Sequence, residues 1–192
     1  MSYIAVSRRT ARRRESELAT RRLVVILSAS AAAAWLISVL LAGSTRVGGF
    51  IHIYALIAHV LAMVVSFGAI LLVDWHGFLW LIGRRGLAET IRLDGAATPL
   101  IWGGLAGMLA SGVFLNANLS STMTDVKLLA VLILTLNGIM LIPLMRRLAH
   151  LAPTASFRDL TLGQRFHMLA CLAISQLCWW TAIVIGFINA AS

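Results

Sequence analysis

Five long apolar runs alternate with short polar segments along this chain of 192 residues. The runs cover residues 23–42, 51–73, 97–117, 126–145 and 166–188. Each is close to the roughly 20 apolar residues that an α-helix needs to cross the hydrocarbon core of a membrane. The pattern therefore predicts an all-α fold, a polytopic membrane helix bundle with five transmembrane helices.

The polar segments leave no room for a second globular domain. We expect an arginine-rich cytoplasmic tail at residues 1–22 and a single transmembrane domain at residues 23–192. The first apolar run follows basic residues, as the core of a signal peptide does, but it is longer than such a core. We therefore expect it to be retained as a membrane anchor.

The basic residues predict the orientation. Of the sixteen lysines and arginines, seven precede residue 23, three lie within residues 83–96 and four within residues 146–165. The other two, Arg46 and Lys127, lie in the remaining loops. Basic residues gather on the cytoplasmic side of a bacterial inner membrane, so the amino terminus is expected inside and the carboxyl terminus outside.

The composition agrees with an integral membrane protein, since 60% of the residues are hydrophobic and 12% are charged. A net charge of +9 is also typical of proteins that bind nucleic acid. Here, however, the arginines are dispersed between apolar runs and form no basic domain. The expected partner is therefore the lipid bilayer with its anionic head groups, and not nucleic acid.

Three polar side chains at membrane depth form a first candidate site. His52 and His59 are seven residues apart and share one face of the second run, and Lys127 opens the fourth run from the same side. Histidine ligates haem iron and other metals, and a buried lysine can act as a ligand or base, which arginine cannot. The alternative is that the histidines are hydrogen-bonded inside the bundle and that Lys127 reaches the interface beside Asp125.

A second candidate site lies at the cytoplasmic side, where His76 ends the second run and His167 begins the fifth. These two histidines could ligate a second cofactor from two helices. The rise from His59 to His76 is about 25 Å along a helix, so the two sites cannot share one metal.

Two further features predict packing. Asp74 is expected to pair with an arginine of the following loop, Arg84, Arg85 or Arg92. Small residues recur in the third run at spacings of three and four and predict a close contact between helices. These residues are Gly103, Gly104, Gly107, Ser111 and Gly112.

A series of short motifs runs through the second to fourth runs. In chain order it consists of His59 followed by Ser66 and Gly68, then Asp74, Ser111-Gly112, Lys127-Leu128 and Leu136-Asn137-Gly138. The series resembles a superfamily of small bacterial membrane proteins that includes CopD-type copper-resistance domains and HemJ-type protoporphyrinogen oxidases. The resemblance implies haem b, with His59 and Lys127 as the residues associated with it. Asp74-Trp75-His76 stands where HemJ-type proteins have Pro-Arg and Tyr-His, so the resemblance implies haem more than any particular reaction.

Three functions compete at this point. The first is a haem-b-binding protein with an electron-transfer or redox role, in which His59 binds the iron, Lys127 or His52 lies opposite, and a quinone or porphyrin is the partner. The second is a non-catalytic accessory subunit of a larger membrane complex or homo-oligomer, docked through the glycine-rich face of the third run. The third is a metal or small-solute permease with a path lined by His52, Ser66 and Asn137. No catalytic residue is assigned, and whether the chain is an enzyme stays open.

Overall fold

The computed structural model describes the backbone of residues 2–191 and the side chains of residues 14–189. Its elements are α1 (Ser2–Ser44), α2 (Gly49–Leu81), α3 (Leu87–Gly112), α4 (Thr122–Leu148), the short 3-10 helix η1 (Phe157–Asp159) and α5 (Leu162–Ala191). Residues 2–191 contain no strand, so the predicted all-α class is confirmed.

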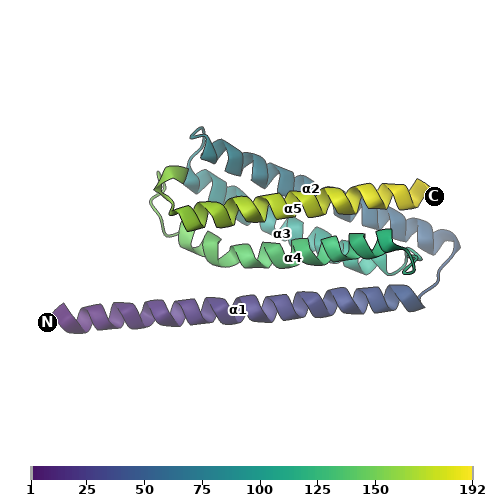
Figure 1. Ribbon diagram of the computed structural model, residues 1–192, viewed down its shortest axis with the longest axis horizontal. Coiled ribbons are helices and arrows are strands. Elements are labelled where there is room, and N and C mark those ends of the chain that lie inside the picture. Colours follow the sequence, from purple (N-terminus) through teal and green to yellow (C-terminus); the bar gives the residue numbers. More distant parts are fainter. Residues whose placement is uncertain (1, 192) are drawn as a thin grey trace.

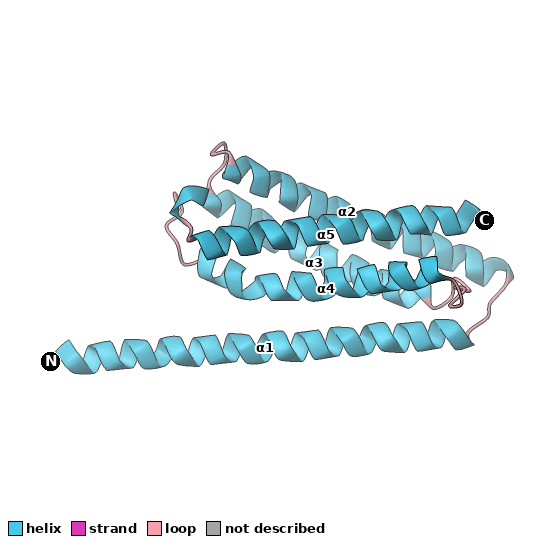
Figure 2. Ribbon diagram, viewed as in Figure 1, coloured by secondary structure: helices cyan, strands magenta, loops and turns pink. Residues whose placement is uncertain are grey.

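The helices run up and down between two ends at which the loops gather (Figures 1 and 2). α2 packs on α3, α4 packs on α5, and α1 lies against α4 and α3. One end holds the loops at residues 82–86 and 149–161, and we call it the arginine end. The other is the lid end, which holds the loops at residues 45–48 and 113–121. The first part of α1 extends past the other helices at the arginine end (Figure 1).

The arginine-rich tail is part of a continuous helix. α1 begins at Ser2 and runs without a break through the first apolar run to Ser44. Arg146 of α4 donates a hydrogen bond of 3.0 Å to Thr20 Oγ1, and so ties the end of the tail to the bundle. The boundary predicted at residue 22 therefore marks a change of composition within one helix.

Four helical segments are long and apolar enough to cross a membrane: Arg14–Ser44, Gly49–Leu81, Thr122–Leu148 and Leu162–Asn189. None of the most apolar window of the first segment, and only 6% of that of the second, is buried inside the protein. Such bare apolar helices need lipid around them. The chain is therefore a multi-pass membrane protein.

α3 differs from the predicted third run at both ends. It begins ten residues earlier, at Leu87, and ends at Gly112, where the chain turns. Its apolar part, residues 97–112, rises about 24 Å. This is less than the ~30 Å of a hydrocarbon core. The first turns of α3 carry Glu89, Arg92 and Asp94 instead.

α2 and α3 approach each other most closely at Gly104. A Cβ atom added there would lie 2.5 Å from Ser66 Cβ and 2.6 Å from the carbonyl oxygen of Ala62. Ser66 is fully buried, and its hydroxyl donates to the Ile101 carbonyl across the interface at 2.9 Å. Gly107 extends the contact, with an added Cβ 3.1 Å from Ala62 Cβ.

The glycine-rich face of α3 is therefore occupied within the chain. The docking surface predicted for an accessory subunit is wrong, because α2 covers Gly104 and Gly107. Gly103 also departs from the predicted stripe, since an added Cβ there meets nothing within 4 Å. Adjacent residues on a helix point about 100° apart, which explains why only one of the two glycines faces α2.

An apolar cluster closes the arginine end of the bundle. Trp80, Leu87, Leu144, Leu148 and Leu160 pack together. The Trp80 indole N–H donates to the Ala155 carbonyl at 2.9 Å, which holds the α4–α5 loop over the cluster.

The same loop contains a small cap at η1. The exposed Asp159 carboxyl accepts hydrogen bonds from the Ser156 backbone N–H and from the Ser156 hydroxyl, and these two bonds lower its pKa. The cap therefore keeps its charge to a pH below the ordinary aspartate range.

Replacing Gly104 by alanine should loosen the contact between α2 and α3. The added methyl group meets backbone as well as side-chain atoms, so the helices must move apart at a cost of about 1–3 kcal/mol. Gly103→Ala adds the same atom into open space and should be neutral or slightly stabilising. Thermal unfolding of the detergent-purified variants measures the difference. Equal melting temperatures for the two variants would contradict the packing described here.

Candidate functional site

All five helices contribute to a cavity of about 100 Å³ towards the lid end, which we call the histidine cavity. Its lining is mostly apolar, and the polar side chains in it are those of Ser38, His59, Thr124 and Lys127. His59 comes from α2 and Lys127 from α4, so the fold brings together two residues that the sequence paired.

The His59 ring is held by α3. Its Nδ1 lies 3.1 Å from Ser111 Oγ, and the Ser111 hydroxyl donates to the Gly107 carbonyl at 2.6 Å. With the single hydroxyl hydrogen directed to the Gly107 carbonyl, Nδ1 is assigned as the donor to Ser111. The neutral ring then carries its lone pair on Nε2, the nitrogen that can accept a hydrogen bond or bind a metal.

Lys127 is half-buried in the first turns of α4. Within the described part of the chain, its ammonium makes no ion pair and no hydrogen bond. Asp125, the partner expected if Lys127 reached the interface, is exposed and forms no salt bridge with it. Lys127 is therefore a charged residue in the cavity lining that has no counter-ion among residues 14–189.

α1 forms one wall of the cavity through two hydrogen bonds to backbone carbonyls. The Trp35 indole N–H donates to Leu128 of α4 at 3.0 Å. The Ser38 hydroxyl donates to Leu109 of α3 at 2.7 Å. Sequence analysis missed both residues, because an indole and a hydroxyl on an apolar run show no periodicity of their own.

Two loops close the lid end of the cavity. Leu115, Ala117 and Leu119 of the α3–α4 loop line it. Asn116 lies among them at a φ of 51°, a left-handed conformation that asparagine tolerates better than most residues. Its side chain accepts from the Val47 N–H at 3.0 Å and donates to the Val47 carbonyl at 2.6 Å, which clasps the two loops together. Sequence analysis did not single out Asn116.

His52 belongs to this lid and does not line the cavity. Its Nδ1 lies 3.3 Å from the Phe114 carbonyl and 3.5 Å from Asn116 Nδ2. His52 and His59 do share one side of α2, as predicted. Their roles differ because His59 lines the cavity, whereas His52 lies in the lid that closes it.

The proposed inner pair, His76 and His167, does not line the histidine cavity. His76 Nδ1 is engaged with the Leu72 carbonyl of its own helix at 3.2 Å. Among the described residues, no group of three or more His, Cys, Asp or Glu side chains is placed to hold a metal ion.

Asp74 has a different partner from the one predicted. Gln176 of α5 donates to its carboxylate at 2.5 Å, whereas Arg85 pairs with Glu89 at 3.4 Å. The prediction that Asp74 pairs with an arginine of the α2–α3 loop is therefore wrong. α2 is long enough to carry that loop well past the level of Asp74.

A second cavity of about 260 Å³ lies nearer the arginine end, between α2, α3, α4 and α5. We call it the aspartate cavity. Its polar lining comes from Asp94, Thr98, Arg146 and Ser175, and Trp102 adds an aromatic wall. This cavity therefore offers charges of both signs.

One layer of side chains separates the two cavities. Leu134 of α4 and Trp179 of α5 line both of them. Trp179 is only 2% exposed and packs on Phe67 of α2 with ring centroids 5.4 Å apart. Leu105 and Met108 complete the apolar cluster around it.

The path predicted for a permease is not the one that the cavities follow. Ser66 is buried against α3, and Asn137 donates to the Cys171 carbonyl of α5 at 2.7 Å. Neither they nor His52 line either cavity. These polar groups hold helices together, which is their commonest role in membranes.

Comparison of the chain with protein-family models, with curated proteins and with solved structures found no match. The resemblance to CopD-type and HemJ-type proteins stays a prediction.

Haem b matches the chemistry of the histidine cavity but not its size. His59 has a ring held through Nδ1, as metal-binding histidines usually have. However, the cavity holds about 100 Å³. Pockets for ordinary drug-sized ligands hold roughly 300–1,000 Å³. In this packing the cavity does not accommodate a haem.

Removing the clasp at Asn116 should open the histidine cavity. Asn116→Gly keeps the left-handed backbone and loses two hydrogen bonds, each worth about 0.5–1.5 kcal/mol. We expect an amine-reactive reagent to acylate Lys127 faster in the purified variant than in the wild type, as measured by mass spectrometry. Asn118→Gly is the control, since among the described residues the Asn118 side chain accepts a hydrogen bond only from the Ser120 N–H of its own turn. Equal labelling in both variants would show that the clasp does not close the cavity.

Proposed function

We propose that this chain moves a small polar solute or ion across the membrane, along a route that joins the histidine cavity to the aspartate cavity. The observation that carries the proposal is the shared wall of Leu134 and Trp179. Each cavity has polar groups in its lining, and the two cavities share these two wall residues.

The shared layer has the properties of a closed gate. Trp179 is buried against Phe67 and belongs to one apolar cluster with Leu105, Met108 and Leu134. An apolar constriction between two polar compartments excludes water and ions until its side chains move apart. These features favour small-solute transport, the third of the competing functions. The route through the two cavities differs from the path that the sequence predicted.

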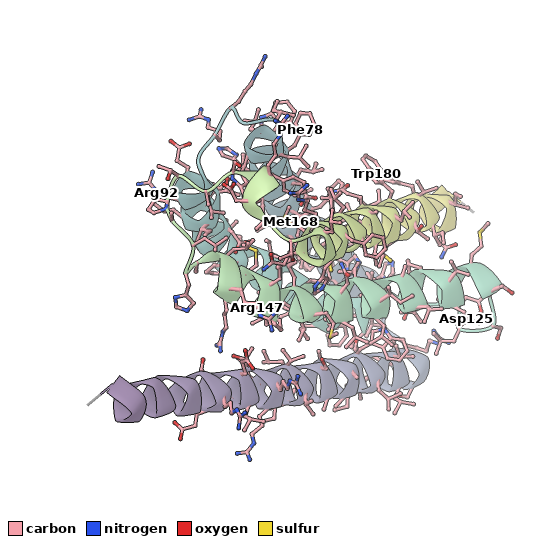
Figure 3. All side chains as sticks on the ribbon, turned by 60° about the vertical axis from the view of Figure 1, so that its left-hand side comes forward. Phe78, Arg92, Asp125, Arg147, Met168 and Trp180 are labelled. Atoms are coloured by element: carbon pink, nitrogen blue, oxygen red, sulfur yellow. The ribbon has the colours of Figure 1, made fainter. Side chains whose placement is uncertain are left out.

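We further propose that all five helices cross a bacterial inner membrane, with the amino terminus in the cytoplasm. The gathering of Arg92 and Arg147 at one end and Asp125 at the other supports this orientation (Figure 3). A membrane-impermeant amine reagent added to intact Asn116→Gly cells should then reach Lys127. Labelling only after the cells are opened would reverse the orientation.

Truncation of the gate should make the membrane leaky. In proteoliposomes carrying Trp179→Ala, we expect faster osmotic swelling than with the wild type for at least one solute of a panel of urea, glycerol, methylammonium, chloride and formate. The physical reason is that the two cavities merge when the indole is removed. Stopped-flow light scattering measures the swelling rate.

Trp180→Ala is the matched control for this experiment. Trp180 follows directly in the chain and also contacts Phe67, but it is 53% exposed and lines neither cavity. Leu134→Ala is a second gate variant in case Trp179→Ala does not fold. Identical swelling for the wild type and both gate variants, with size-exclusion profiles showing folded protein, would overturn the transport proposal.

A haem-b protein is the second candidate function, favoured because His59 and Lys127 line one cavity. Loading would require the helices around that cavity to separate. The haem hypothesis predicts a Soret band and sharpened reduced bands for protein purified from haem-replete cells, both lost in His59→Ala. A featureless wild-type spectrum would reject it.

A further inference from the structure

We infer that the histidine cavity is a binding site for a small monovalent anion, with Lys127 as its cationic partner. The inference rests on the proposed function, because it names the class of solute. It also concerns binding, which can be measured separately from transport.

Charge balance is the first argument. Lys127 is half-buried and lines the cavity, and its ammonium has no ion pair and no hydrogen bond among the described residues. Among the residues that the structure describes, no carboxylate lines the histidine cavity. Asp125 is exposed, and Asp94 lines the other cavity beyond the Leu134–Trp179 layer. A charge withdrawn from water without a counter-ion is costly, and an anion in the cavity supplies one.

Hydrogen-bond donors are the second argument. Thr124, which is 2% exposed, lies in the cavity wall near Lys127 and accepts a hydrogen bond from Asn189 at 3.4 Å. Its own hydroxyl hydrogen has no acceptor among the described residues and can therefore be donated to a ligand. The polar surface of the cavity thus favours an acceptor of hydrogen bonds that carries negative charge.

Size is the third argument. About 100 Å³ is room for an ion of a few atoms. A halide, nitrite or formate matches this volume, whereas gluconate does not. The apolar remainder of the wall, which includes Met63, Met108 and Ile183, disfavours strongly hydrated divalent anions.

Protection of Lys127 from acylation tests the site. Lys127 is the only lysine of the chain, so a single peptide reports its reactivity. The full-length protein in detergent is treated with a trace of amine-reactive reagent in formate, chloride or sulfate, with gluconate at equal ionic strength as the reference. We expect formate or chloride to slow the acylation of Lys127 several-fold relative to gluconate, and sulfate to leave it unchanged.

Two variants separate binding from general effects of salt. Arg46→Lys places a second amine on the exposed surface of the lid end, and its acylation should be the same in all four salts. Thr124→Val keeps the shape of the side chain and removes the hydroxyl, so it should reduce the protection several-fold. A folded protein in which no anion protects Lys127, or in which the amine introduced at position 46 is protected equally, would overturn the inference.

The outcome is distinguishable from failure of the transport proposal. Protection by an anion without any change of swelling in the gate variants leaves the binding site and removes the transport. Swelling in urea or methylammonium without protection removes the anion site and leaves a route for another solute.

Discussion

The rest of the bundle depends on the close approach of α2 and α3. Where Gly104 meets Ala62 and Ser66, the two backbones come nearer than any larger residue would allow. Without a hydrophobic driving force between helices in lipid, this kind of contact holds them together through dispersion and through hydrogen bonds such as that from Ser66 to Ile101. The contact also sets the register of the two helices, and so the level at which His59 meets Ser111 and Gly112.

The position of the histidine cavity follows from that register. α2 and α3 present the histidine and its orienting serine, while α4 brings Lys127 to the same level through its packing on α5 and α1. The most apolar window of α1 is not buried at all, yet Ser38 lines the cavity, and hydrogen bonds from Trp35 and Ser38 tie α1 to α4 and α3. The lid loops then close one end and Trp179 the other. The site therefore belongs to the whole bundle.

Much of the architecture was predictable, because apolar length is a strong signal in a membrane protein. Four predicted spans have counterparts in long apolar helices, and the third lies in a helix whose polar start extends it. The pairing of His59 with Lys127 was predictable, because both residues were expected on the same side of the membrane and at a similar depth in their apolar runs. The expected role of the glycines as a packing surface was right, but their partner is α2.

What the sequence could not reveal depends on registers between distant helices. Gln176 meets Asp74 only because α2 and α5 cross at that level. Asn116 clasps Val47 because two loops from different hairpins end side by side. Trp179 looks like Trp180 in the sequence, and only the packing shows that one is buried and the other faces outward. None of these three features can be read from a periodic pattern of hydrophobic and polar residues.

The shared position of Trp179 links the contents of the two cavities. A single indole is the floor of one cavity and the ceiling of the other. Any occupant that pushes it towards one side removes volume from the other side. Two occupants would then oppose each other, and by thermodynamic reciprocity each would weaken the binding of the other by the same factor. Occupancy of one cavity would then be coupled to occupancy of the other through the position of one side chain, without any change of fold.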